Sequence, residues 1–272
     1  MLIIFSGGSG VGKNTVIEHL IAHGGFALMP TYTTRARRPN ESEGHPYHFL
    51  SDAEFEAKLR EGEFYEHQQV HGHYYGTSKK LLRESLATGK ILLKDIDVLG
   101  TQNLVRAVGE DLKIVTIFLK VDSSDVLAER LRGRGEQEIE LRLRRFDMEQ
   151  SHAAEYDYII NNVDLQATLS AVLQIVQEET SGAPMYATRE QKAELASLLP
   201  VAEKLRAGEK LPPVPVVQSG GKSYLLDGQD AYLAARMAGA RLAKELVVRP
   251  LPPLPDEAAW LSLVKQADEL VK

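Results

Sequence analysis

Short apolar runs alternate with amphipathic stretches over the first 180 residues of the chain. Four runs are short, apolar and rich in β-branched residues, as buried strands are: 2–5, 91–97, 114–119 and 158–161. Apolar residues recur at helical spacing in five further stretches: about 52–61, 78–88, 99–108, 123–133 and 165–179. Strands that alternate with helices predict an α/β fold, with a parallel sheet covered by helices on both faces.

The texture of the chain changes after residue 180, where Ser181-Gly182-Ala183-Pro184 breaks the last of these helices. We place a domain boundary there. The elements expected beyond it are a helix near 188–207, a strand pair at 214–218 and 223–226, a helix at 229–238, a strand at Val247–Val248 and a final helix capped by Asp256. This order predicts a small α+β domain over residues 185–272.

Composition and charge narrow the class of protein. The 272 residues are 43% hydrophobic and 26% charged, which is typical of a soluble globular protein, and the net charge of −6 argues against binding along a nucleic-acid backbone. The absence of cysteine excludes disulfides, thiolate metal sites and thiol nucleophiles. No apolar stretch approaches the roughly 20 residues of a membrane span, and Met1 leads directly into the first strand. We therefore expect a cytoplasmic protein, and the sequence leaves open whether it forms a homodimer.

A glycine-rich loop directly follows the first apolar run and carries the clearest chemistry. Its glycines let the backbone curl so that N–H groups point at phosphate oxygens, and Lys13 supplies a cation for the β- and γ-phosphates. The order G-x-x-x-x-G-K fits the Walker loop, except that Asn14 stands where Ser or Thr usually contacts Mg²⁺. An inert glycine-rich turn is the alternative. The residues expected to bind ATP here are Gly7, Gly8, Ser9, Gly10, Val11, Gly12, Lys13, Asn14 and Thr15.

Residues 31–49 concentrate three arginines with hydroxyl side chains and a tyrosine. The planar fork of an arginine pairs with two phosphate oxygens at once, so this stretch suits a phosphate monoester. Taken alone it could equally be a solvated basic loop.

Four further motifs, together with the Walker loop, resemble the guanylate kinase family in order and spacing. They are Thr33-Thr34-Arg35 with Arg38, Glu41, Gly44 and Tyr47-x-Phe49; Glu63-Phe64-x-Glu66; Gly72-x-Tyr74-Tyr75-Gly76-Thr77; and Ile96-Asp97-x-x-Gly100. The resemblance covers residues 1–180. It implies a P-loop nucleotide kinase with a parallel sheet, a GMP-binding subdomain at 31–80 and a lid at 130–146. The implied reaction transfers the γ-phosphoryl group of ATP to GMP or dGMP, giving ADP and GDP, as a step of purine nucleotide metabolism.

The same resemblance implies roles for individual residues. The GMP phosphate would be held by Arg35, Arg38, Tyr47 and Tyr75. Carboxylates of Glu66 and Asp97 would accept hydrogen bonds from guanine N1–H and N2–H₂, and the hydroxyls of Thr31 and Thr77 would read O6. The catalytic cations would be Lys13, Arg35, Arg134 and Arg142. Asn161 would touch the adenine edge, and Mg²⁺ would accompany ATP near Asn14 and Asp95.

Some features depart from the family pattern or leave alternatives open. The lid after Gly135 reads about three residues short, so Arg144 or Arg145 could replace Arg142. A catalytically silent protein-binding module is one alternative function, although such modules lose the phosphate loop or its lysine. A P-loop kinase for another phosphate acceptor, such as a ribose phosphate, is a second. It would leave Glu66 and Asp97 without a base to read.

The C-terminal segment resembles the ParB/sulfiredoxin-like fold in one motif, a strand, the Asp227-Gly228 turn and a helix that ends near Gly239. Asp230 and Ala231 occupy the positions where that family carries His-Arg. The segment is therefore expected to be an accessory module with a regulatory, dimerising or packing role.

Overall fold

The computed structural model describes residues 1–38, 41–44, 46–70, 72–133, 139–187, 194–247, 251–252, 254 and 256–271. The chain forms two compact units, each considered by itself below. Unit 1 comprises Met1–Leu119 and Glu136–Glu149, and unit 2 comprises Lys120–Gly135 and Gln150–Lys272. Among the described residues, no helix combines the length and the apolar character that crossing a membrane requires.

Unit 1 is built on parallel strands in the order β9–β1–β8–β2. Their bounds are β1 (Leu2–Ser6), β2 (Phe26–Leu28), β8 (Ile91–Asp95) and β9 (Ile114–Lys120). Every residue of β1 is buried, as expected for a parallel strand covered on both faces. Leu2 and Ile4 lie in one core cluster with Leu104 and Val108. Successive side chains of a strand point to opposite faces, so Ile3 and Phe5 point the other way.

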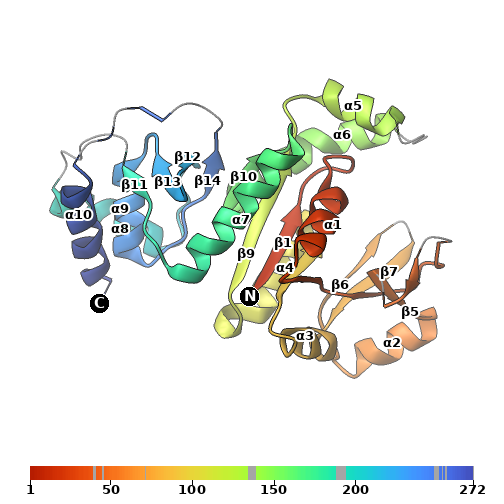
Figure 1. The fold of residues 1–272 in the computed structure, drawn as a ribbon. Coiled ribbons are helices and arrows are strands. Elements are labelled where there is room, and N and C mark those ends of the chain that lie inside the picture. Colours follow the sequence, from red (N-terminus) through yellow and green to blue (C-terminus); the bar gives the residue numbers. More distant parts are fainter. Residues whose placement is uncertain are drawn as a thin grey trace. The chain divides into compact units, whose positions relative to one another are not determined.

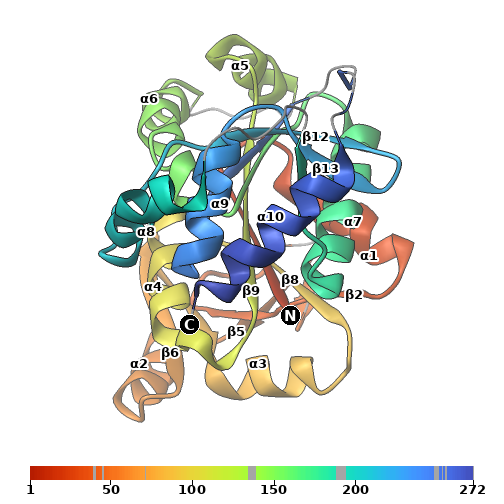
Figure 2. The same ribbon diagram turned by 90° about the vertical axis from the view of Figure 1, so that its left-hand side faces the viewer.

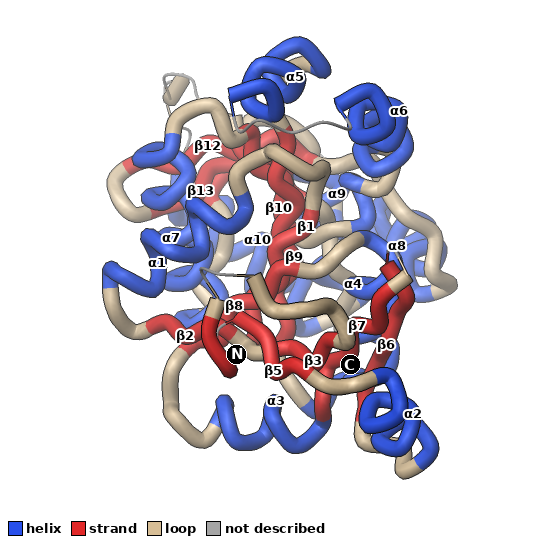
Figure 3. The backbone as a smooth tube through the Cα atoms, turned by 90° about the vertical axis from the view of Figure 1, so that its right-hand side faces the viewer, coloured by secondary structure: helices blue, strands red, loops and turns tan. Residues whose placement is uncertain are grey.

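The helices around this sheet are α1 (Lys13–His23), α3 (Lys79–Leu86), α4 (Val98–Val108) and α6 (Ile139–Gln150), with a short 3₁₀ turn at Gly109–Asp111. Figure 3 shows α1 and α4 on opposite faces of the sheet. The predicted parallel sheet with helices on both faces is thus confirmed for this unit. The helix expected at 123–133 is α5 (Ser124–Gly133), which belongs to unit 2.

A second sheet of unit 1 has the strand order β4–β5–β3–β7–β6 (Figure 1). The strands are β3 (Thr31–Thr33), β4 (Ser42–Glu43), β5 (Pro46–Phe49), β6 (Phe64–Val70) and β7 (His73–Ser78). The hydrophobic pattern did not predict them, because they are short and carry polar side chains. Only the resemblance indicated a subdomain at 31–80.

Aromatic stacking joins this sheet to α2 (Asp52–Arg60). The helix begins with a capping box, in which Ser51 and Glu54 bond each other's backbone N–H groups. The ring of Phe55 stacks on Phe64 at 4.6 Å and on Tyr74 at 5.1 Å between centroids. Gly76 lies beneath these rings, where a Cβ atom would come within 2.9 Å of both Phe55 and Phe64. Glycine is required there for close approach.

Unit 2 contains a sheet in the order β11–β13–β12–β14–β10. The strands are β10 (Tyr158–Asn161), β11 (Tyr186–Ala187), β12 (Val214–Ser219), β13 (Lys222–Leu225) and β14 (Lys244–Leu246). β12 and β13 form the predicted antiparallel pair, with Gly220 and Gly221 at positive φ in the two-residue turn. β14 lies between β12 and β10 and runs parallel to both.

The helices of unit 2 besides α5 are α7 (Leu165–Ser181), α8 (Leu199–Arg206), α9 (Gln229–Ala238) and α10 (Glu257–Glu269), with 3₁₀ turns at Ala153–Glu155 and Leu195–Leu198. Figure 2 shows α8, α9 and α10 side by side. Two expectations change here. The helix expected near 188–207 is described only from residue 194, as a 3₁₀ turn followed by α8. The strand expected at Val247–Val248 is instead β14, and Val248 lies outside the described residues.

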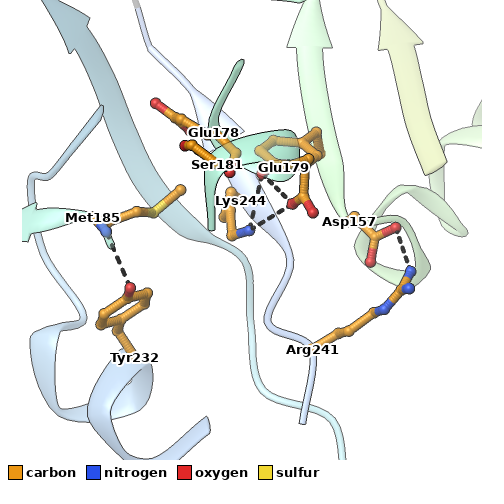
Figure 4. Close-up of polar contacts among 9 residues, drawn as sticks. Asp157, Glu178, Glu179, Ser181, Met185, Tyr232, Arg241 and Lys244 are labelled. Carbon is orange, nitrogen blue, oxygen red and sulfur yellow. Dashed lines mark hydrogen bonds and ion pairs between the residues drawn. The ribbon is translucent and has the colours of Figure 1, made fainter. Parts of the chain in front are cut away.

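Polar side chains fasten β14 and α7 to β10 (Figure 4). The Tyr158 hydroxyl donates to Glu179 at 2.7 Å, and Lys244 Nζ lies 3.1 Å from the same hydroxyl. Arg241 donates to Asp157 at 2.9 Å. These polar residues explain why the hydrophobic pattern misplaced the strand. The end of α7 at Ser181 coincides with the proposed domain boundary, while the sheet joins β10 to strands from beyond it. The extent of an accessory domain stays a prediction.

Candidate active site

The loop between β1 and α1 is shaped by glycines that no other residue could replace. Gly7 has φ 127°, and a Cβ atom there would lie 2.1 Å from the carbonyl oxygen of Leu119. Gly10 and Gly12 also have positive φ, at 94° and 103°. Within the described chain no side chain caps the N-terminus of α1, which begins at Lys13. A helix start of this kind, behind a curled glycine loop, favours an anion.

Backbone carbonyl oxygens of the loop hold the Lys13 side chain in place over it. Its Nζ donates to the carbonyl oxygen of Gly7 at 2.7 Å and lies 3.3 Å from that of Gly8. The Asp95 carboxylate, at the end of β8, lies 3.8 Å from the same ammonium. The predicted P-loop residues are thus gathered in one place, with the predicted metal residue Asp95 beside them.

Arg35, Tyr47 and Tyr75 come together from three strands or loops of the second sheet. The guanidinium of Arg35 donates to Glu41 at 2.6 Å and to the Ala36 carbonyl at 2.7 Å, and it lies 5.3 Å from the centroid of the Tyr47 ring. Tyr47 and Tyr75 meet edge to face at 5.8 Å. Burial lowers the pKa of Arg35, but hydrogen bonds with Glu41 and Tyr75 outweigh it and raise the pKa. The Arg35 guanidinium therefore stays positively charged at physiological pH.

Arg38 and the hydroxyl of Tyr47 complete this group. Arg38 donates through its backbone N–H to Glu41 at 2.9 Å. Burial raises the pKa of Tyr47 to about 12, and the nearby charge of Asp95 adds to this effect. Tyr47 is therefore a neutral hydrogen-bond donor at physiological pH. Together with Arg35 it presents a donor surface that suits a phosphate monoester.

A pocket of about 240 Å³ adjoins this group. Its lining residues come from the second sheet and from the end of β8: Thr31, Tyr47, Glu66, Gln68, Tyr75, Lys94, Asp95, Ile96 and Asp97. Glu66 is 8% exposed and accepts a hydrogen bond from the buried Thr77 hydroxyl. Asp97 caps α4 and accepts from the Gly100 N–H at 2.7 Å. Thr31, Glu66, Thr77 and Asp97 are thus brought together as the resemblance implied.

Charges in the pocket shift one another's ionisation. Burial raises the pKa of Glu66, while Lys94 and Thr77 act in the opposite direction. Burial lowers the pKa of Lys94 to about 8, and the carboxylates of Glu66 and Asp95 oppose this decrease. Lys94 and Glu66 therefore each favour the charged form of the other, whereas Asp97 disfavours the ionised form of Glu66.

Sequence reasoning assigned no role to two residues of this pocket. Lys94 Nζ donates to the Thr31 hydroxyl at 2.6 Å. The amide nitrogen of Gln68 is buried without a hydrogen-bond partner among the described residues. A lysine directly after the apolar residues 91–93, within the predicted strand 91–97, is the signal that could have singled out Lys94; nothing comparable marks Gln68.

Three predicted site residues are not brought into this group by the described structure. Arg134 lies outside the described residues, and Arg142 lies in α6 with its side chain outside them. Asn161 ends β10 in unit 2, where its amide donates to Asp122. Their assigned roles stay predictions.

The donor set near Lys13 suits a magnesium ion that arrives with a nucleotide. Mg²⁺ in such sites takes most of its ligands from phosphates and water and few from the protein. Asn14, exposed in the first turn of α1, and the Asp95 carboxylate offer oxygen ligands. In the part of the chain that the structure describes, no cluster of three or more His, Cys, Asp or Glu could hold a metal by itself.

Comparisons with known proteins concern the first two thirds of the chain. A family model described as guanylate kinase matches residues 1–179. A guanylate kinase of Chlorobaculum tepidum is 40% identical over 181 residues, which span 65% of this chain and 92% of that protein. One of Bartonella quintana is 39% identical over 183 residues, 66% of this chain and 82% of that protein. The crystal structure of guanylate kinase from Anaplasma phagocytophilum superposes with a TM-score of 0.52 at 30% identity, covering 66% of this chain and 85% of that one.

Proposed function

Because the chain belongs to the guanylate kinase family, we propose that it transfers the γ-phosphoryl group of ATP to GMP, giving ADP and GDP. The loop that ends at Lys13 would hold the ATP phosphates, and the pocket of about 240 Å³ would hold the guanine base. The family and the P-loop kinase fold predicted from the sequence are both confirmed by the comparisons. The single observation that supports the acceptor most is the pairing of a carboxylate-lined pocket with the Arg35–Tyr47–Tyr75 group.

The polar groups of the pocket favour guanine over adenine. Guanine presents two adjacent donors, N1–H and N2–H₂, and the carboxylates of Glu66 and Asp97 can accept both. Adenine would turn an unprotonated nitrogen toward the same carboxylates. A buried charged acceptor left without a donor costs several kcal/mol, which is enough for strong discrimination.

For Thr77 we propose a different role from the one that the resemblance implied. In the structure the Thr77 hydroxyl donates to Glu66, which is an acceptor only when ionised. Its proton is therefore directed at Glu66, and its oxygen offers a lone pair to the base. We accordingly assign reading of O6 to Thr31, and assign to Thr77 the positioning of the Glu66 carboxylate.

Phosphoryl transfer requires alignment and charge neutralisation more than a covalent catalyst. Lys13 would neutralise the donor phosphates, and Arg35 would bring the acceptor phosphate and its charge to meet them. Asn14 and Asp95 would hold Mg²⁺, which would supply further neutralisation of phosphate charge when bound. Arg134 and Arg142 are the proposed lid cations, which would complete the site and help to exclude water.

The rest of the chain is proposed to be accessory to this reaction. Residues 185–272 carry Asp230 in the first turn of α9 and Ala231 next to it, where the resembling fold would place a histidine and an arginine. These two positions therefore supply no cation for a phosphate. We propose a packing or regulatory role for this segment, in a cytoplasmic enzyme that acts on free nucleotides.

An assay with several acceptors tests the function. ADP formation is followed with ATP and Mg²⁺ in the presence of GMP, dGMP, AMP or ribose 5-phosphate. We expect turnover with GMP and dGMP, and a decrease of at least about 10²-fold in kcat/KM with AMP, since a mismatched buried polar group causes losses of this size. Turnover with none of the acceptors would favour the protein-binding alternative. Preference for the sugar phosphate would overturn the guanine assignment.

A further inference from the structure

Lys94 is a charged residue in the interior of an apolar strand. It lies in β8 with 1% of its surface exposed, and it lines the pocket together with Thr31 and Glu66. Burial of an ammonium group costs several kcal/mol unless polar partners replace its water. A methionine would fill similar space without this cost. The presence of the charge therefore points to a task inside the pocket.

The hydrogen bond from Lys94 to Thr31 leaves the Thr31 hydroxyl proton for another acceptor. Lys94 Nζ lies 2.6 Å from Thr31 Oγ1, which connects two residues from β8 and β3. An ammonium group can only donate, so the threonine oxygen accepts. A hydroxyl has a single proton, which then remains for another acceptor. Among the described residues no side chain or carbonyl accepts it, so it is available to a molecule in the pocket.

The carboxylate side of the pocket has the opposite polarity. Thr77 donates to Glu66, and Asp97 already accepts from the N–H of Gly100, so both carboxylates present acceptor oxygens. The pocket thus has a donor edge at Lys94 and Thr31 and an acceptor edge at Glu66 and Asp97. A 6-oxopurine presents a carbonyl at C6 next to its N1–H, and this order matches both edges. A 6-aminopurine presents the reverse order.

We propose that Lys94 is a specificity-determining residue, which positions the Thr31 hydroxyl as a donor to the carbonyl at C6 of the acceptor base. The inference rests on the proposed function, because it takes this pocket as the site of the acceptor purine. Lys94 acts through Thr31 and is a positioning residue. Its ammonium also places a positive charge near Glu66.

Steady-state kinetics with three acceptors separates this role from a structural one. The acceptors are GMP, IMP and 2-aminopurine riboside 5′-monophosphate, of which only the first two carry the carbonyl at C6 and the proton on N1. The third should therefore have a higher KM in wild type, and each variant is compared with wild type on the same acceptor. We expect Lys94→Met to raise KM about tenfold for GMP and for IMP, the size of one lost hydrogen bond to a charged or polarised group. KM for ATP and for the 2-aminopurine nucleotide should stay within about twofold of wild type.

Thr31→Val and the double variant test whether the effect passes through the threonine. If it does, adding Lys94→Met to Thr31→Val raises KM for GMP no further. Additive losses, an unchanged KM in Lys94→Met, or an equal loss with the 2-aminopurine nucleotide would each overturn the inference. An unchanged KM for GMP and IMP in Thr31→Val would instead contradict the acceptor assignment of the proposed function, as would a wild-type protein inactive with GMP.

A matched control removes a partly buried lysine of the same chain, whose side chain is 17% exposed. Lys244 lies in a strand of unit 2, with a tyrosine hydroxyl at 3.1 Å and the Glu179 carboxylate at 3.9 Å. Lys244→Met therefore loses a comparable ammonium group, and its ratio of KM values between GMP and the 2-aminopurine nucleotide should stay at the wild-type value. A changed ratio in this variant would show that loss of a buried charge suffices, and would overturn the assignment.

Lys94→Leu serves if Lys94→Met does not fold. It removes the same ammonium donor, so KM for GMP and for IMP should rise about tenfold, while KM for the 2-aminopurine nucleotide stays within about twofold of wild type. An equal rise for all three acceptors would contradict the inference.

Discussion

In the proposed function, Lys13 lies where the charge of the triphosphate is concentrated. Its ammonium bonds the carbonyl of Gly7 at 2.7 Å and lies 3.8 Å from Asp95, so that a flexible side chain is held ready over the loop. Pre-organised charge of this kind acts mainly on the transition state, where negative charge is redistributed over the transferring group. Substitutions of single residues should therefore change kcat and KM separately.

For Lys13→Ala we expect kcat to fall by about 10³-fold or more, because one pre-organised charge contributes several kcal/mol to phosphoryl transfer. The fold should persist, since Lys13 begins α1 and alanine is a good helix former. ADP release measures the first effect and a thermal melt the second. An enzyme that retains most of its activity would exclude the assigned role.

Glu66→Gln tests recognition of the base. The amide keeps the size of the side chain but replaces an acceptor oxygen by an N–H₂ donor, which faces the donors of guanine. We expect KM for GMP to rise about 10- to 100-fold, corresponding to about 1–3 kcal/mol for an unpaired buried group. KM for ATP serves as the internal control. Equal losses for both nucleotides would speak against base recognition.

At the scale of elements, the second sheet depends on close packing rather than on long strands. Its strands span two to seven residues, and α2 is fastened to them by the stack of Phe55 on Phe64 and Tyr74. The acceptor residues Glu66, Tyr75 and Thr77 lie on the strands beneath this stack. Displacing the rings should therefore move the pocket.

Gly76→Ala introduces a Cβ within 2.9 Å of the rings of Phe55 and Phe64. We expect destabilisation of about 1–3 kcal/mol from overpacking, and a KM for GMP that rises more than the KM for ATP. Chemical denaturation measures the first effect. Gly133→Ala is the matched stability control, because nothing lies within 4 Å of its added Cβ. Similar stability of the two variants would show that the rings give way without cost.

At the scale of the molecule, the C-terminal strands complete the sheet of unit 2 and are more than an appendage to it. β14 pairs with β10 over Tyr158–Ile160, and these three residues are at most 4% exposed. A strand edge that loses its neighbour exposes unpaired N–H and C=O groups along with apolar side chains.

Deletion of residues 184–272 should therefore lower the melting temperature and cause self-association. Differential scanning calorimetry and analytical ultracentrifugation measure the two effects. The single variant Arg241→Ala removes the 2.9 Å contact with Asp157 but no strand, and should stay monodisperse. A truncated chain with an unchanged melting temperature and no increase in mass would contradict this account and favour an independent accessory domain.

Elements formed by contiguous residues could be predicted from the sequence, whereas pairings between distant residues could not. The phosphate loop, the strands β1, β9 and β10 and the helices α2, α3 and α4 arise from contiguous residues, so the sequence pattern predicted them directly. The resemblance supplied the acceptor residues, which composition and spacing alone left ambiguous. The placement of β14 was wrong by a few residues, because Lys244 and Glu245 are polar and find buried partners only in the folded sheet.

By itself the sequence determined the family and the phosphate loop, because short runs of contiguous residues carry both, whereas the acceptor residues came from the resemblance and stay predictions. Only the tertiary structure decided that Lys94 meets Thr31 across 63 positions of the chain, and that β14 comes to lie beside β10. Such pairings depend on which surfaces meet when apolar faces are buried. No local sequence pattern specifies which surfaces meet. The packing of distant elements therefore decides which polar groups lie in the same pocket.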